Sequence, residues 1–194
     1  MVNIEKWVKD GWNLYKNNLV NFLSIYAIYL LAALLLQKVP ILPIIIMPSL
    51  FGSLVIITLN KIRNIEEIDI KNILTGFTYF LPLMLSSIVI GILVLFGLML
   101  LVLPGLIVSA LYIYTIPLIV DQKLDFWQAM ETSRKKVMED AFGFIIFGIL
   151  LMAMIISGAM FLGVGLMVTM PIAVNTLTYA YIDIFSGEKT ITIK

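Results

Sequence analysis

The chain has 194 residues, of which 61% are hydrophobic and only 13% are charged, and its mean hydropathy is +1.06. A soluble domain carries about 25% charged residues, so this composition indicates an integral membrane protein with several spans and no separate soluble domain. The chain has no Cys and no His, which excludes disulfides, thiolate zinc sites and imidazole acid–base catalysis, and its formal net charge of +1 creates no field that would recruit nucleic acid.

The first two predicted spans form a hairpin near the N-terminus. A helix needs about 20 apolar residues to cross the hydrocarbon core of a bilayer. Residues 19–37 and residues 41–60 carry no charge, and Lys38 and Pro40 mark the turn between them. No small-x-small cleavage site follows the first apolar run, so we expect the N-terminus to be retained.

The next uncharged stretch covers residues 72–120, which is too long for one span and suits two. The tripeptide Leu-Pro-Gly at 103–105 predicts the turn, because Pro and Gly interrupt helices. We therefore expect helices at 80–102 and 105–120. Pro117 predicts a kink near the inner end of the second helix.

The last uncharged stretch, residues 141–182, predicts two further helices at 141–161 and 165–184. The sequence LGVG at 162–165 marks the turn between them. The sequence thus predicts an all-α polytopic membrane protein with six transmembrane helices in three hairpins, forming a single membrane domain over residues 1–194.

The distribution of positive charge supports this count of spans. With six spans, every cation except Lys38 falls on one side of the membrane. The positive-inside rule places that side, together with both termini, in the cytoplasm. We therefore expect a multi-pass protein of the cell membrane with its N- and C-termini in the cytoplasm.

A segment of mixed polarity precedes each predicted hairpin, and we expect these segments to be amphipathic helices at the membrane interface. They cover residues 3–18, 68–80 and, with nine charges in residues 121–142, the third connection. Their predicted N-caps are Asn3, Asp69 and Asp125.

The same pattern divides the chain into three candidate units, 1–60, 61–120 and 121–194. Trp7 and Trp127 are 120 residues apart, as are Lys16 and Lys136, which favours a repeat. The alternative is that any protein built from hairpins needs polar connections, and the sequence leaves both interpretations open.

Tryptophan and lysine on these segments are typical of helices that lie in the membrane interface. Trp7, Trp12 and Trp127 are therefore the predicted interfacial anchors, with membrane lipids as the partner. A second interpretation is that the segments dock on a cytoplasmic protein or on anionic lipid.

A few polar residues of the predicted spans could line a path for a solute. Thr169, Asn175 and Thr176 lie on or near one face of the last helix, and Asp121 and Asp183 lie at inner ends of helices. The two carboxylates could bind a cation or proton together, or each could pair with a basic neighbour such as Arg134. Small and hydroxyl residues also permit close helix packing, which is the favoured interpretation. The sequence indicates no catalytic, cofactor-binding or metal-binding residues.

Residues 117–136 read PLIVDQKLDFWQAMETSRKK and carry a family resemblance. A Pro precedes the inner end of a span, an acidic residue and a short linker follow, and then W-x-A-x-x-x-S precedes basic residues. This pattern resembles the DUF975 and YciC-like integral membrane proteins and the membrane domain of some glycerophosphodiester phosphodiesterases, and residues 11–23 are similar to their opening segment. The matching positions are Pro117, Asp121, Trp127, Ala129 and Ser133.

The resemblance implies a six-span helical membrane protein and supplies no catalytic residues, because the phosphodiesterase domain has no counterpart in this chain. We therefore expect a non-enzymatic membrane protein that organises lipid or protein partners, as a homo-oligomer. The alternative is a transporter or channel for a small or apolar solute, with a path between the predicted helices 105–120 and 165–184. Burial of Thr169, Asn175 and Thr176 in dry packing would count against that alternative.

Overall fold

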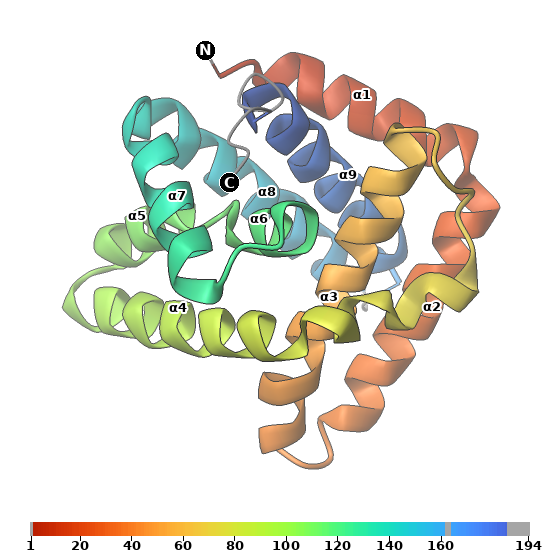
Figure 1. The fold of residues 1–194 in the computed structure, drawn as a ribbon, viewed down its shortest axis with the longest axis horizontal. Coiled ribbons are helices and arrows are strands. Elements are labelled where there is room, and N and C mark those ends of the chain that lie inside the picture. The colour runs from red at the N-terminus through yellow and green to blue at the C-terminus, as the bar shows by residue number, and fades with distance from the viewer. Residues whose placement is uncertain (1, 162–163, 186–194) are drawn as a thin grey trace, which may run out of the picture.

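The structure is a computed structural model that describes residues 2–161 and 164–185, and over these ranges the chain forms helices joined by turns, without β-strands. The predicted all-α class is therefore confirmed for the described residues. The elements follow one another in three groups of similar order, each beginning with an amphipathic segment (Figure 1).

The first group contains α1 (Ile4–Asn17), α2 (Leu19–Leu36) and α3 (Ile41–Ile62). The Asn3 side chain accepts a hydrogen bond from the N–H of Lys6 and caps α1, as predicted. Helices α2 and α3 agree with the first two predicted spans to within two residues at each end.

The second group contains η1 (Ile70–Tyr79), α4 (Phe80–Leu100), α5 (Val102–Leu111) and α6 (Thr115–Gln122). The predicted cap Asp69 accepts a hydrogen bond from the N–H of Lys71, but η1 is a 3₁₀ helix and not an α-helix. The prediction of one continuous helix at 105–120 is wrong, because the chain turns at residues 112–114 between α5 and α6.

The third group contains α7 (Phe126–Met138), α8 (Ala141–Met160) and α9 (Leu166–Phe185). Asp125 caps α7, as predicted, by accepting a hydrogen bond from the N–H of Trp127. Asp140 does the same for α8 at the N–H of Gly143. The predicted turn at 162–165 lies partly outside the described residues.

Within the described residues, five helical segments are long and apolar enough to cross a membrane: Leu19–Leu36, Ile41–Ile62, Ile70–Leu100, Val102–Gln122 and Ala141–Met160. The chain is therefore a membrane-embedded helical protein. Helix α9 does not reach the same apolarity, because it carries Asn175, several Thr residues and Asp183.

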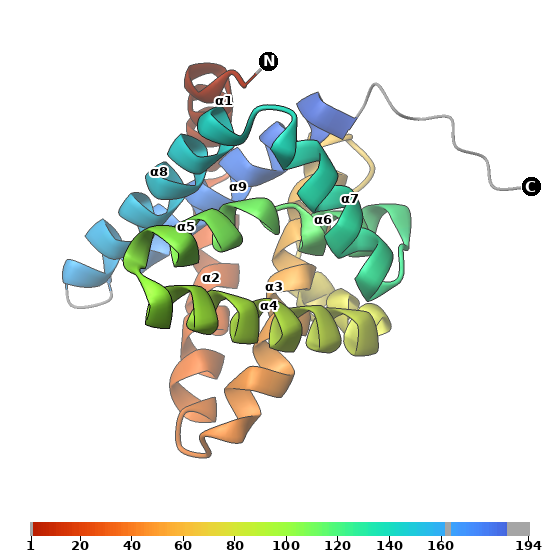
Figure 2. The same cartoon turned by 90° about the vertical axis from the view of Figure 1, so that its left-hand side faces the viewer.

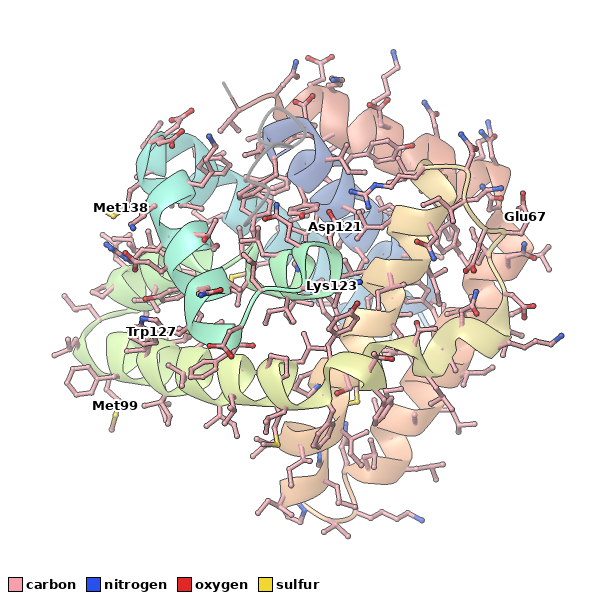
Figure 3. All side chains as sticks on the ribbon, viewed as in Figure 1. Glu67, Met99, Asp121, Lys123, Trp127 and Met138 are labelled. Atoms are coloured by element: carbon pink, nitrogen blue, oxygen red, sulfur yellow. The ribbon has the colours of Figure 1, made fainter. Side chains whose placement is uncertain are left out.

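The three hairpins do not run parallel to one another. In both views α4 runs across the direction of α2 and α3 (Figures 1 and 2). Met99 at the tip of the α4–α5 hairpin and Glu67 in the charged segment after α3 lie at opposite edges of the molecule (Figure 3). Among the described residues, Lys38 is the charged residue at a hairpin turn; the others lie on amphipathic segments or at the opposite helix ends.

Each amphipathic segment packs along a helix of the preceding group, in a cyclic order. Segment η1 packs on α3, α7 packs on α6 and the end of α5, and α1 packs on α9. The N-terminal helix thereby joins the first group to the last. The closest contacts involve small residues, since a Cβ on Gly76 would lie 2.1 Å from the carbonyl oxygen of Ser49, and one on Gly11 would lie 2.6 Å from Oγ1 of Thr176.

Helix α9 forms the centre of the molecule. All eight residues from 171 to 178 are buried, because α1, α2, α3 and α8 all pack against this helix. A helix surrounded by protein has no need of an apolar surface toward lipid, so its polar residues can be accommodated by packing and hydrogen bonds. This burial explains why the least apolar of the predicted spans is also the most enclosed.

Candidate functional site

The main polar cluster joins the C-terminal ends of three helices. Both terminal nitrogens of Arg63, which caps α3, contact the carboxylate of Asp121 on α6, with Nη2 at 2.8 Å from Oδ2. The hydroxyl of Tyr181 on α9 donates a further hydrogen bond of 2.8 Å to the same Oδ2. Asp121 lies close to α3 and α9 (Figure 3). The cluster therefore connects one helix from each of the three groups.

This ion pair is partly removed from water. The side chains of Arg63 and Asp121 are 27% and 15% exposed, respectively. Hydrogen bonding to Asp121 raises the pKa of Arg63 above its ordinary value, so the guanidinium keeps its positive charge. The bidentate geometry fixes the relative orientation of α3 and α6.

The backbone at these helix ends turns sharply. Asn64 and Lys123, which follow α3 and α6, adopt φ values of 54° and 57°, in the left-handed region. A residue in the left-handed conformation commonly terminates a helix, and Gly is the usual residue at such a position. The turn after each helix directs the chain into the next amphipathic segment.

Asp183 forms a second, separate polar contact. Its carboxylate accepts hydrogen bonds of 2.9 Å from Nζ of Lys6 and of 2.9 Å from Nε1 of Trp7, both on α1. The hydrogen bond to Asp183 raises the pKa of Lys6. Asp121 and Asp183 therefore each have their own cation. The sequence predicted that each carboxylate could pair with a basic neighbour, and the structure shows such a pair for both. Arg134, the neighbour named as an example, contacts Glu131 instead.

The arrangement of acidic residues does not resemble a metal site. Within residues 2–161 and 164–185, no group of three or more carboxylates could hold a metal ion. A polar hollow of about 470 Å³ next to Asp183 is lined by residues of both charges, including Lys136, Glu139 and Asp140.

The polar face of α9 is buried against neighbouring helices. The side-chain oxygen of Asn175 accepts a hydrogen bond of 3.3 Å from Thr58 on α3, and its amide nitrogen donates one of 3.4 Å to the carbonyl of Gly11. Thr176 is fully buried against Gly11. Thr169 donates to the carbonyl of Gly165 within its own helix at 3.2 Å.

Thr169 also lies at the contact between α8 and α9. A Cβ built on Gly158 would lie 1.9 Å from Oγ1 of Thr169, so only glycine allows the two helices to approach this closely. Asn175 and Thr176 are inaccessible to solvent, and Thr169 is half-buried. All three residues therefore contribute to helix packing.

The resemblance motif surrounds the break between α5 and α6. Pro117 has no N–H, and its ring excludes the carbonyl of Ile113 from a regular helix, which explains the break. The Ser133 hydroxyl on α7 donates a hydrogen bond of 2.8 Å to the carbonyl of Leu111 and accepts one of 3.2 Å from the N–H of Tyr114. One side chain thus satisfies two backbone groups that the break leaves without helical partners.

The remaining motif residues flank this contact. Ala129 is fully buried one turn before Ser133 on α7, where a larger side chain would separate α7 from the helices it packs on. Trp127 is 62% exposed on the outside of α7. The motif therefore combines a packing face with an exposed aromatic residue.

Trp7 is not an interfacial anchor in this structure. It is 1% exposed and packs edge-on against Phe147, with 5.1 Å between ring centroids. It cannot contact lipid from this position, so the expectation is corrected: the apolar face of α1 faces the protein. Trp12 and Trp127 are 47% and 62% exposed, and their role as anchors stays a prediction.

Trp7 is buried and Trp127 is exposed, so these two residues do not occupy equivalent positions on α1 and α7. The buried face of α1 consists of Trp7, Gly11 and Tyr15, and that of α7 includes Ala129, Ser133 and Val137. These sets have the same spacing and are 122 residues apart, whereas the predicted register was 120. In an alignment of these buried faces, Trp7 corresponds to Ala129 and not to Trp127.

Several residues of the candidate site were not singled out from the sequence. They are Lys6, Gly11, Thr58, Arg63 and Tyr181. Arg63 could have been found as the cation directly at the inner end of a span. Gly11 and Thr58 give no signal before the contacts between helices are known.

Comparisons of the chain with family models, curated proteins and solved structures give no match. The resemblance at residues 117–136 therefore stays a prediction.

Proposed function

We propose that this chain is a six-span protein of the cell membrane, with both termini in the cytoplasm, that organises lipid or protein partners and catalyses no reaction. The length and apolarity of the five segments and the one-sided distribution of charge support this topology; the support does not come from helix direction, since α4 runs across α2 and α3. Helix α9 is the sixth span in this proposal. Its lower apolarity is compatible with spanning because other helices surround it.

The burial of the α9 polar face is the observation that favours an organising role over transport. A solute path needs polar groups that face a cavity. Asn175 and Thr176 instead contact α1 and α3 without solvent access, and Asp121 and Asp183 are each paired with a cation. The residues on which the transport alternative was based are thus used for packing.

The surface on α7 and the start of α8 supports contact with a partner. Trp127, Met138 and Phe142 are exposed by 62%, 58% and 76%. Basic residues, Lys135 among them, lie on the same helix. Exposed aromatic residues next to cations suit the headgroup region of a membrane, and a cytoplasmic protein or a second copy of the chain could use the same surface.

The topology can be tested directly because the chain has no cysteine. We expect Lys38→Cys to react with a membrane-impermeant maleimide added to intact cells, since it lies at the outer turn. Lys123→Cys should react only after the cells are opened. Labelling of both residues from the same side would contradict the six-span arrangement.

The organising role can be tested with purified protein in vesicles of phosphatidylcholine and fluorescent phosphatidylglycerol. We expect the protein to cluster the fluorescent lipid, which is measured as self-quenching, and Trp127→Ala to reduce the effect. Phe96→Ala, at a residue 64% exposed on α4, is the matched control. Protein-dependent efflux of a small trapped dye, without clustering of lipid, would favour the transport alternative instead.

A further inference from the structure

Helix α4 crosses the hairpin of α2 and α3 (Figure 1). Residues of these three helices line an apolar groove. It has a volume of about 550 Å³. A second hollow of about 510 Å³ lies next to it, and both are lined by Phe51, Ser87, Gly91 and Leu95. We call the two together the α3–α4 groove. No charged side chain lines either hollow.

Three residues with hydroxyl groups interrupt this apolar lining, and two of them, Tyr29 and Ser87, lie in the first hollow, with Tyr112 in the second. Tyr29 is 6% exposed and Ser87 is half-buried, and both line the groove. Neither hydroxyl has a hydrogen-bond partner in the part of the chain that the structure describes. An unpartnered hydroxyl in an apolar environment costs roughly 1–3 kcal/mol. These groups are therefore available to an acceptor that enters the groove.

Two further residues, one on α3 and one on α4, leave the groove without regular helix packing. Pro48 lies inside α3 and lines the groove, and it has no N–H to donate to the carbonyl of Ile44. Gly91 on α4 leaves open space, since an added Cβ would have no heavy atom within 4 Å. Gly91 is exposed at the groove, and among the glycines that the structure describes it is the one at which an added Cβ would meet no neighbour, so a ligand has room at this position.

From these features we infer that the α3–α4 groove binds an acyl lipid, with its ester carbonyl accepting hydrogen bonds from Tyr29 and Ser87 and its hydrocarbon chain lying along Ile88, Ile92 and Leu95. The lining matches this chemistry, because it presents hydroxyl donors within a hydrocarbon surface and no charge. The helices that form it are all membrane-compatible, so bilayer lipid is the molecule in contact with the groove. This inference rests on the proposed function, for which it specifies a lipid partner.

The binding can be tested with the full chain in phosphatidylcholine vesicles that contain a trace of phosphatidylcholine with a diazirine on one acyl chain. After illumination, mass spectrometry locates the labelled residues. We expect labelling of α3 and α4 at the groove to exceed that of the exposed face of α8 about five-fold or more. Equal labelling of the groove and of α8 would show ordinary surrounding lipid and overturn the inference.

Two variants separate the contributions of space and of hydrogen bonding. Gly91→Leu places a side chain in the groove at a position where an added Cβ meets no heavy atom within 4 Å, and it should abolish the excess labelling, whereas Ala153→Leu, at an exposed position on α8, should not. Tyr29→Phe should reduce groove labelling about five-fold, which is the effect of one neutral hydrogen bond. Labelling that Gly91→Leu leaves unchanged would also overturn the inference.

The carbonyl is tested with an ether-linked analogue of the same probe. Because this analogue has no carbonyl, wild type and Tyr29→Phe should label equally. If Tyr29→Phe still weakens labelling by the ether lipid, the proposed hydrogen bond is wrong. Labelling near Trp127 in the same samples reports on the proposed surface contact. Labelling near Trp127 without labelling of the groove would overturn only the groove inference. Labelling of the groove without labelling near Trp127 would count against the proposed surface contact.

Discussion

Gly11 shows how one residue can control the position of an entire helix. A Cβ added to Gly11 would lie 2.6 Å from Oγ1 of Thr176 and 2.8 Å from the backbone nitrogen of the same residue. Backbone cannot move aside as a flexible side chain can, so α1 would have to shift away from α9. We expect Gly11→Ala to lower the free energy of unfolding by about 1–3 kcal/mol, as overpacking typically does. Denaturant unfolding of the purified protein in detergent measures the change.

The matched control is Gly91→Ala, which makes the same substitution in a membrane-compatible helix. No heavy atom lies within 4 Å of the added Cβ, so this variant should be as stable as wild type or slightly more stable, because Ala favours helix more than Gly does. Equal destabilisation by the two substitutions would show that Gly11 is not a special contact.

The ion pairs of Glu131 predict that the stability of the folded state depends on pH. Arg134 hydrogen bonds to this carboxylate at 2.7 and 2.9 Å, and Lys135 lies 3.4 Å away. These contacts, chiefly the hydrogen bonds from Arg134, lower the pKa of Glu131 from 4.5 to about 2. A lowered pKa stabilises the folded state above pH 4.5, and this contribution is lost as the pH falls from 4.5 toward 2.

NMR titration of protein labelled with ¹³C in glutamate side chains can measure this pKa. Arg134→Gln should move the titration midpoint of Glu131 back toward 4.5. Lys135→Gln should move it less, because Lys135 is more distant. If the midpoint stays unchanged in Arg134→Gln, the ion pair does not form in solution.

At the scale of elements, the break between α5 and α6 depends on a contact from α7. The Ser133 hydroxyl satisfies the carbonyl of Leu111 and the N–H of Tyr114. We expect Ser133→Ala to lower the free energy of unfolding by about 1–3 kcal/mol, because buried backbone groups lose their partner. Ser109→Ala removes a hydroxyl that bonds only to Leu106 of its own helix, so thermal unfolding should detect a smaller change. An equal change would mean that the break is not held by Ser133.

The elements themselves were largely predictable from the sequence. Uncharged runs located α2, α3, α4, α8 and α9 to within a few residues, since burial of backbone in hydrocarbon requires long apolar helices. The break after α5 was not predicted beyond a kink at Pro117. Its stability depends on Ser133, which is distant in sequence, and no local pattern reports that contact.

The candidate site was less predictable for the same reason. The sequence identified Asp121, Asn175, Thr176 and Asp183 as polar residues of the spans, but their partners come from other helices. Trp7 was assigned to the surface because its helix is amphipathic. Amphipathicity shows that one face is covered, but it does not show whether lipid or protein covers it.

At the scale of the whole molecule, the cyclic packing gives the three groups a common joint. Each amphipathic segment docks on a helix of the preceding group, and α1 completes the cycle by docking on α9. The C-terminal ends of α3, α6 and α9 meet at Arg63, Asp121 and Tyr181. Loss of this cluster should therefore affect all three groups together and not only the helix that carries the substitution.

Asp121→Asn tests this coupling. It leaves the guanidinium of Arg63 partly buried without its counterion, and we expect the free energy of unfolding to fall by about 2 kcal/mol. Hydrogen exchange should increase at the C-terminal ends of α3, α6 and α9 alike, because the cluster holds all three. Asp125→Asn is the matched control, since Asn caps a helix as well as Asp does and α7 should stay intact. Faster exchange confined to α6 in Asp121→Asn would show that the three groups are not coupled through this cluster.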